Sequence, residues 1–188
     1  MLLDIGAGIF LAILVSEVSA QSLTFSFVIA GIAFALLPDV DFIYHVFKKG
    51  TYRDAHRHRE MLHYPLIFIP AGMLLIAIVN PIWSLLFGLA YLVHLVHDSI
   101  GIGWGVQWLY PFKKDHFSFL YIYRPAHQNR LPRQWLYRWK NEDIDSLSEQ
   151  YGDKDWLRNI YLRGHPYAII ELLVLLAAVA TLYYVYNM

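Results

Sequence analysis

The stretch 82–98, IWSLLFGLAYLVHLVHD, begins as a continuous apolar run and ends in two histidines and an aspartate. On a helix His94 and Asp98 lie on one face, one turn apart, with His97 beside them. Ionisable groups at membrane depth cost several kcal/mol unless they are paired or bound to an ion. Imidazole nitrogen and carboxylate oxygen are ligands for Zn²⁺, Mn²⁺ and Fe²⁺. The stretch therefore predicts a membrane helix that supplies half of a metal site, and a buried His–Asp hydrogen bond between helices is the alternative.

The composition of the whole chain also indicates a membrane protein. The chain has 188 residues, of which 57% are hydrophobic and 16% charged, and its mean hydropathy is +0.39. An ordinary soluble domain has roughly 25% charged residues. We predict an all-α membrane protein with a single domain over residues 1–188. The absence of cysteine excludes disulfides, thiolate metal sites and a cysteine nucleophile, and the net charge of zero argues against direct binding of nucleic acid.

About five transmembrane helices are predicted from the distribution of apolar residues. The apolar segments are 5–20, 23–37, 64–79, 82–104 and 167–186. A spanning helix needs about 20 residues, so the second and third segments reach that length only with flanking residues. Glu17 and Glu171 fall within the first and last segments, and we expect both to lie at a membrane interface.

The positions of the basic residues predict the orientation. Of the 15 Lys and Arg residues, five lie in 38–63 and ten in 105–166. The positive-inside rule then places both loops and the N-terminus in the cytoplasm and the C-terminus outside, in a multi-pass membrane protein. Within the cytoplasmic interfacial loop 112–166, two amphipathic helices are expected on the inner leaflet, one over 132–140 and one capped by Asp153. His116 is expected to be an ordinary surface or interfacial residue.

Two further polar clusters flank the apolar segments. Asp39 and Asp41 follow Pro38, where they would share or bridge metal ions, or would simply end one helix and cap the next. In the run 56–63, HRHREMLH, the residues His56, Glu60 and His63 would share a helix face. His58 and His63 are five residues apart, so they can meet only across a turn.

Two types of residue near these clusters have simpler explanations. Arg57 and Arg59 would hold a phosphate group, or would merely contribute to the positive charge of the cytoplasmic side. Asp4, just before the first apolar segment, is by itself expected to be an N-cap.

Four motifs in order make the chain resemble the YdjM-like family. They are Leu37–Asp41 (LPDVD), His58–His63 (HREMLH), His94–Asp98 (HLVHD) and Gly105–Phe112 (GVQWLYPF). Members are described as membrane-bound metal-dependent hydrolases and as LexA-binding, inner-membrane-associated proteins. The resemblance covers roughly residues 1–115 and implies six metal ligands: Asp39, Asp41, His58, His63, His94 and Asp98.

The chain departs from the family pattern in three places. Glu60 and Leu62 replace the Gly and Thr of the family's H-R-G-x-T-H motif, so Glu60 is a candidate ligand or base. Asp4, four residues before Gly8, occupies the place of a family histidine and is a candidate seventh ligand. The long aromatic loop and the last apolar segment lie outside the resemblance.

The residues and the resemblance together lead to an expected function. The expected protein is a hydrolase of a lipid or lipid-linked phosphoester at the cytoplasmic face, with one or two divalent ions, Zn²⁺ favoured over Mn²⁺, Fe²⁺ or Mg²⁺. Glu60 or His97 would accept a proton, and Arg59 with Arg57 would bind the anionic group. The alternative is a non-catalytic, metal-stabilised scaffold or a regulatory partner of a cytosolic protein. Transport is disfavoured because the polar residues cluster at one end of the predicted helices.

Overall fold

The computed structural model describes residues 1–52, 59, 61–120 and 134–188. It is mostly helical, but the all-α prediction is met only in part, because the chain also forms a two-stranded sheet. The five predicted apolar segments correspond to α1 (Leu2–Val18), α2 (Phe25–Leu36), α4 (Pro65–Ala77), α5 (Pro81–Asp98) and α7 (Pro166–Asn187). One further helix, α3 (Val40–Lys49), follows α2 almost directly.

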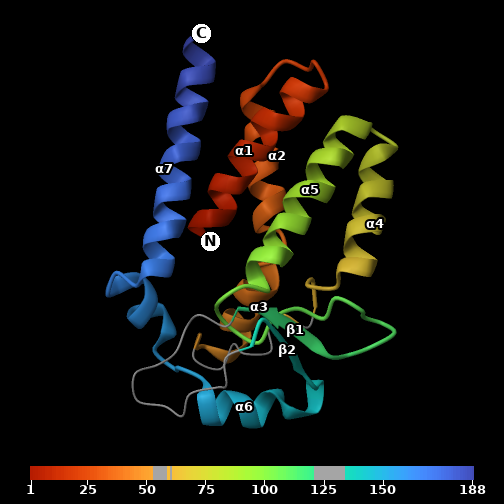
Figure 1. Cartoon of the computed structure of the whole chain (residues 1–188). Helices are drawn as coiled ribbons and strands as arrows, with labels where there is room; N and C mark the ends of the chain where they lie inside the picture. The colour runs from red at the N-terminus through yellow and green to blue at the C-terminus, as the bar shows by residue number, and fades with distance from the viewer. Residues whose placement is uncertain (53–58, 60, 121–133) are drawn as a thin grey trace.

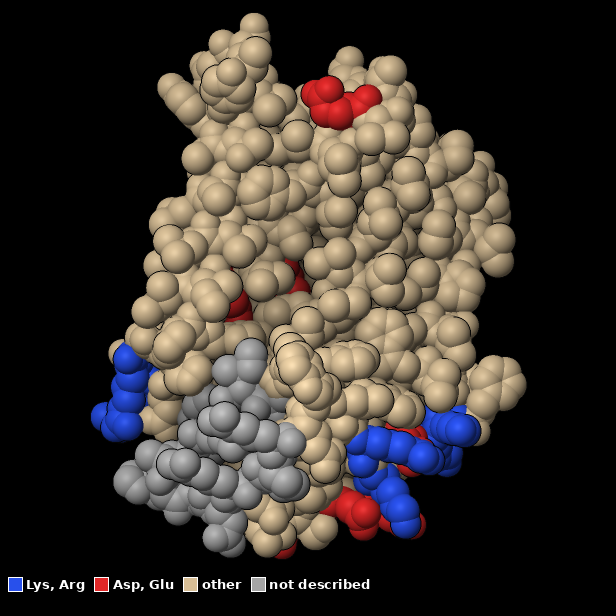
Figure 2. All heavy atoms as spheres, viewed as in Figure 1, with Lys and Arg blue, Asp and Glu red and all other residues tan. Residues whose placement is uncertain are grey.

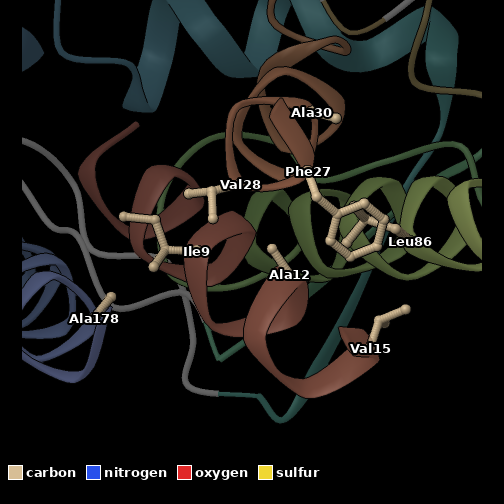
Figure 3. Packing of buried hydrophobic residues seen from close by; sticks show 8 residues of the cluster. All are labelled: Ile9, Ala12, Val15, Phe27, Val28, Ala30, Leu86 and Ala178. Carbon is tan, nitrogen blue, oxygen red and sulfur yellow. The ribbon is translucent and has the colours of Figure 1, made fainter. Parts of the chain in front are cut away.

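The helices pack around α1, which contacts α7, α2 and α5, while α4 packs on the outer side of α5 (Figure 1). A tight crossing brings α1 and α2 together at two glycines. A Cβ atom on Gly8 would lie 2.6 Å from the carbonyl oxygen of Gly31, and one on Gly31 would lie 2.4 Å from that of Gly8. The apolar core beside this crossing draws on α1, α2, α5 and α7 (Figure 3): Ile9, Ala12, Val15, Phe27, Val28, Ala30, Leu86 and Ala178.

The prediction of about five membrane crossings is not confirmed. Among the described residues, α5 and α7 are long and apolar enough to span a membrane, and α2 with α3 would make a third crossing if this pair, bent by 55°, is one span. The reason is helix length. At about 1.5 Å per residue, the 12 residues of α2 and the 13 of α4 rise only about 18–20 Å, against a hydrocarbon thickness of about 30 Å.

The loop between α5 and α7 folds differently from the prediction. Residues 136–139, expected in an amphipathic helix, form strand β2 (Leu136–Trp139), which pairs antiparallel with β1 (His116–Phe119). The alternation of Tyr137 and Trp139 with exposed Leu136 and Arg138 suits a half-buried strand as well as a helix face. Next come the short η2 (Asn141–Asp143) and α6 (Ile144–Tyr151). Tyr137 and Ile144 are buried against Trp104.

The second predicted amphipathic helix is present, as a short helical turn that ends in η3 (Arg158–Leu162). Asp153 begins this turn, because its carboxylate accepts hydrogen bonds from the backbone N–H of Asp155 and the side chain of Asn159. His116 is buried rather than at the surface, next to Gln107 and Asn141.

Charge is distributed unevenly along the long axis of the molecule. In Figure 2, the Lys and Arg side chains on the visible face lie in the lower half, where Figure 1 shows the strands and α6. The upper part of that face, formed by the ends of the apolar helices, is almost entirely uncharged. This is the charge asymmetry on which the predicted orientation depends.

Candidate metal centre

Four side chains meet at the lower end of the helix bundle. Asp39, His63, His94 and Asp98 each offer one ligand atom, and these atoms all lie within 4.8 Å of one another. His63 and His94 are fully buried, whereas the side chain of Asp39 is 19% exposed. Two imidazoles and two carboxylates are a donor set suited to Zn²⁺ and to Mn²⁺ or Fe²⁺.

Local sequence explains how three chain segments reach this point. Pro38 cannot donate a backbone hydrogen bond, so α2 ends and the chain turns into α3, with Asp39 at its N-cap. Pro65 is the first residue of α4, and His63 lies in the segment just before it. His94 and Asp98 occupy the last turns of α5, on the same face, as the spacing predicted.

Each of the two histidines has an aspartate on its far side. His63 Nδ1 lies 2.8 Å from Asp41 Oδ2, an oxygen that also accepts a hydrogen bond from the backbone N–H of Leu62. His94 Nδ1 lies 3.3 Å from Asp4 Oδ1. In both rings Nε2 therefore faces the shared centre. Asp41 and Asp4, both expected to be ligands, lie outside the group of four and stand behind the histidines.

The distances within the group fit a single ion. The two Nε2 atoms are 3.4 Å apart, and Asp98 Oδ2 lies 3.1 Å from His63 Nε2 and 3.8 Å from His94 Nε2. Asp39 Oδ1 is 3.8 Å from His94 Nε2. Ligand atoms about 2.0–2.1 Å from a tetrahedral zinc ion are separated by about 3.3 Å. The residues present thus fit a bound divalent cation.

His63 carries an electrostatic signature of this arrangement. Burial alone would lower its pKa, because the charged imidazolium is poorly solvated there. The hydrogen bonds to Asp41 and Asp98, together with their negative charges, outweigh burial and raise the pKa of His63 to about 9. The two aspartates therefore favour a positive charge at the position of the His63 ring.

Arg59 holds one of the candidate ligands. Its Nε lies 2.6 Å from Asp98 Oδ2, and Nη1 donates to the backbone carbonyls of Asp98 and Ile102, at 2.9 and 3.3 Å. The guanidinium lies over Gly103, which has φ +83°, and a Cβ atom there would come within 2.7 Å of Nη1. In the structure Arg59 therefore secures the end of α5.

His97 belongs to a neighbouring buried network. Its Nδ1 lies 3.0 Å from Asp4 Oδ1, and its Nε2 is within hydrogen-bond reach of the Tyr167 hydroxyl and 3.5 Å from Glu171 Oε1. Both ring nitrogens thus face away from the group of four. His58 and Glu60, the remaining predicted site residues, lie outside the described residues, as do His56 and Arg57.

Glu171 is the site-adjacent residue that the sequence interpretation missed. It was expected at a membrane interface, but it is buried in the bundle. It accepts hydrogen bonds from the Tyr161 hydroxyl, at 3.0 Å, and from the backbone N–H of Leu2, at 3.1 Å. A signal was available, because Glu171 is the only charged residue in 167–186, and an isolated carboxylate in an apolar run requires a buried partner.

Comparison with known proteins assigns the family. No curated protein and no solved structure matches the chain significantly. A family model described as YdjM inner membrane protein matches residues 4–187 and so extends far beyond the roughly 115 residues in which the resemblance was evident. The matched range includes the last apolar helix, and with it Glu171. By this match over nearly its whole length, the chain belongs to the YdjM family of inner membrane proteins.

Proposed function

We propose that Asp39, His63, His94 and Asp98 bind one divalent metal ion, with Zn²⁺ favoured, and that the protein is a membrane-embedded metal-dependent hydrolase. The observation that supports this proposal is the convergence of four ligand atoms within 4.8 Å of one another. When bound, such an ion would act as a Lewis acid that activates water and stabilises negative charge on a phosphoryl oxygen. A lipid or lipid-linked phosphoester at the cytoplasmic face is the proposed substrate, because the group lies at the end of apolar helices.

The side chains of the protein would have distinct tasks in this reaction. Asp41 and Asp4 would hold His63 and His94 with Nε2 directed at the centre. Arg59 would keep the Asp98 carboxylate in position. Asp39, the most exposed of the four, lies on the side from which a substrate would approach. We do not assign His97 as the base, because both of its ring nitrogens already contact other side chains.

A metal-stabilised scaffold is the second candidate, and one observation favours it. Structural zinc sites are closed by four protein ligands, whereas catalytic zinc sites keep one position open. The group offers four side chains. A closed site would contribute free energy to folding and would leave the small β1–β2 and α6 region as the surface for a cytosolic partner.

Metal analysis of the purified protein tests the ion, and a substrate panel tests the enzyme. We expect about one ion per chain by mass spectrometry of the elements, loss of that ion in His94→Ala, and retention in His45→Gln, a half-buried histidine outside the group. An unchanged metal content in His94→Ala would reject the site. With the ion present, hydrolysis of phospholipid or phosphoester substrates that a chelator abolishes supports the enzyme. A stabilising ion without hydrolysis supports the scaffold.

A further inference from the structure

One face of α3 is apolar and exposed along its whole length. Val40, Tyr44 and Phe47 follow one another at intervals of four and three residues, the spacing of a single helix face, and Ile43 lies beside them. Leu37, at the end of α2, precedes them by one turn. They expose between 39% and 85% of their surface, and Phe47 exposes the most. A helix facing water would carry polar side chains at these positions, so we expect this face to lie against another apolar surface.

The opposite face of α3 is turned toward the protein and carries polar groups. Asp41 is buried there, where it binds His63. Phe42 packs its ring edge-on against Trp156, with ring centroids 6.2 Å apart. The one buried side chain of α3 is thus a carboxylate, whereas its apolar face is exposed.

The position of α3 and its charges identify what covers the apolar face. α3 continues α2 after a bend of 55°, and it lies at the end of the molecule that holds the strands and α6 (Figure 1). Its last turn carries two exposed lysines, Lys48 and Lys49, before Gly50 ends the helix. Lys48 lies 5.7 Å from the centre of the Tyr44 ring, so the positive charge adjoins the apolar face.

We propose that α3 is an interfacial helix whose apolar face is seated in the cytoplasmic leaflet, with Lys48 and Lys49 at the level of anionic lipid headgroups. Apolar side chains backed by basic residues at one helix end are the pattern of such helices. Because Asp39 and Asp41 stand at the start of the same helix, the headgroup layer adjoins the candidate metal centre. The inference does not depend on metal binding or catalysis.

Site-directed spin labelling in lipid nanodiscs tests this directly, because the chain has no native cysteine. Single variants Ile43→Cys and Phe47→Cys place a nitroxide on the exposed face. Val179→Cys on α7 serves as the lipid-exposed reference and Glu142→Cys as the water-exposed one, since both side chains are exposed. Accessibility to oxygen reports lipid, and accessibility to a water-soluble nickel chelate reports water. Neutral discs of phosphatidylcholine are compared with discs containing phosphatidylglycerol.

We expect labels at 43 and 47 to resemble the label at 179, with nickel accessibility several-fold lower than at 142. Phosphatidylglycerol should lower it further, and Lys48→Gln combined with Lys49→Gln should abolish that difference. Nickel accessibility equal to that at 142 would overturn the proposal. So would labels protected from both reagents and coupled to each other, because a second copy of the chain would then cover the face. If the nickel accessibility is the same in neutral discs and in discs with phosphatidylglycerol, the role of the two lysines is overturned.

Discussion

His63 and His94 each present Nδ1 to an aspartate and Nε2 to a common centre. For His63, whose Nδ1 is hydrogen-bonded to Asp41, this arrangement selects one tautomer and one ring orientation. The family resemblance implied that Asp41 is a ligand and made Asp4 a candidate seventh ligand, whereas the structure places both at the back of the imidazoles. The site therefore contains two kinds of aspartate: candidate ligands, Asp39 and Asp98, and residues behind the imidazoles, Asp4 and Asp41. Substitutions should affect metal binding differently in the two kinds.

Asp41→Asn should weaken metal binding without abolishing it. The amide still fills the space beside His63 but no longer holds its ring with a charge, so we expect the affinity to fall about 10–100-fold. A zinc titration in a calorimeter measures the affinity, and the stoichiometry should still reach one ion per chain. Asp98→Asn is the matched comparison, in which a ligand itself is lost. Equal and complete loss of binding in both variants would make Asp41 a direct ligand.

Metal affinity should rise with pH. His63 binds its proton tightly, with a pKa raised to about 9 by Asp41 and Asp98 despite burial, and an incoming ion must displace that proton. The apparent affinity for the metal ion should therefore increase up to a pH of about 9.

The stability of the metal-depleted protein should change in the opposite direction, because protonated His63 stabilises the folded state. This contribution to the free energy of unfolding is complete below the unfolded pKa of about 6.5 and is lost as the pH rises through about 9.

Calorimetric titrations and thermal unfolding across this pH range check both trends. Asp41→Asn provides the control, because removing that charge lowers the pKa of His63 and shifts both curves toward lower pH. A metal affinity independent of pH would contradict the role given to His63.

At the scale of elements, the position of Asp4 depends on how closely α1 approaches its neighbours. α1 contacts α2, α5 and α7, and the crossing at Gly8 and Gly31 leaves no room for a side chain. The bend between α2 and α3 likewise determines where Asp39 and Asp41 stand. The geometry of the candidate centre is therefore set by helix packing as well as by the residues themselves.

Gly8→Ala should destabilise the protein and loosen the candidate centre. The added Cβ atom would lie 2.6 Å from a backbone oxygen that cannot rotate away, so the helices must separate, at a cost of about 1–3 kcal/mol. Thermal unfolding in detergent measures the loss. Ala33→Leu, at an exposed position of α2, is the control and should leave the melting temperature nearly unchanged. A wild-type melting temperature in Gly8→Ala would show that the crossing is looser than described.

At the scale of the molecule, charge and hydrophobicity divide along one axis. Lys and Arg occur only in the two long polar stretches, and their visible side chains lie at the end with the strands and α6 (Figure 2). In Figure 1 the C-terminus lies at the opposite end of α7 from this region. The two ends of α7 should therefore face opposite sides of the membrane.

Reporter fusions test this orientation. Alkaline phosphatase fused after Met188 should be active, because the enzyme folds only outside the cytoplasm, and a green fluorescent protein fused there should be dark. The same reporters inserted at Gly152, in the region after α6 that is expected in the cytoplasm, should give the reverse result. Fluorescence from the C-terminal fusion would reverse the orientation derived from the basic residues.

The sequence predicted the local features well and the contacts between distant segments poorly. The apolar runs became α1, α2, α4, α5 and α7 because hydrophobic content and helix spacing are local properties. Residues 136–139 became a strand because the pairing with β1, about 20 residues away, outweighed a helical pattern of aromatic and basic residues. Glu171 was assigned to an interface because its partners His97 and Tyr161 come from other segments.

By itself, the sequence determined that the chain is a mostly helical inner membrane protein of the YdjM family, with His94 and Asp98 on one helix face. Composition, spacing and motif order suffice for those conclusions, since each depends on residues close together in the chain. Only the tertiary structure decided that Asp39 and His63 join them, that Asp4 and Asp41 stand behind the histidines, and that α3 turns an apolar face outward. Those facts depend on the bend after α2 and on the Gly8–Gly31 crossing, because packing between helices fixes which side chains meet.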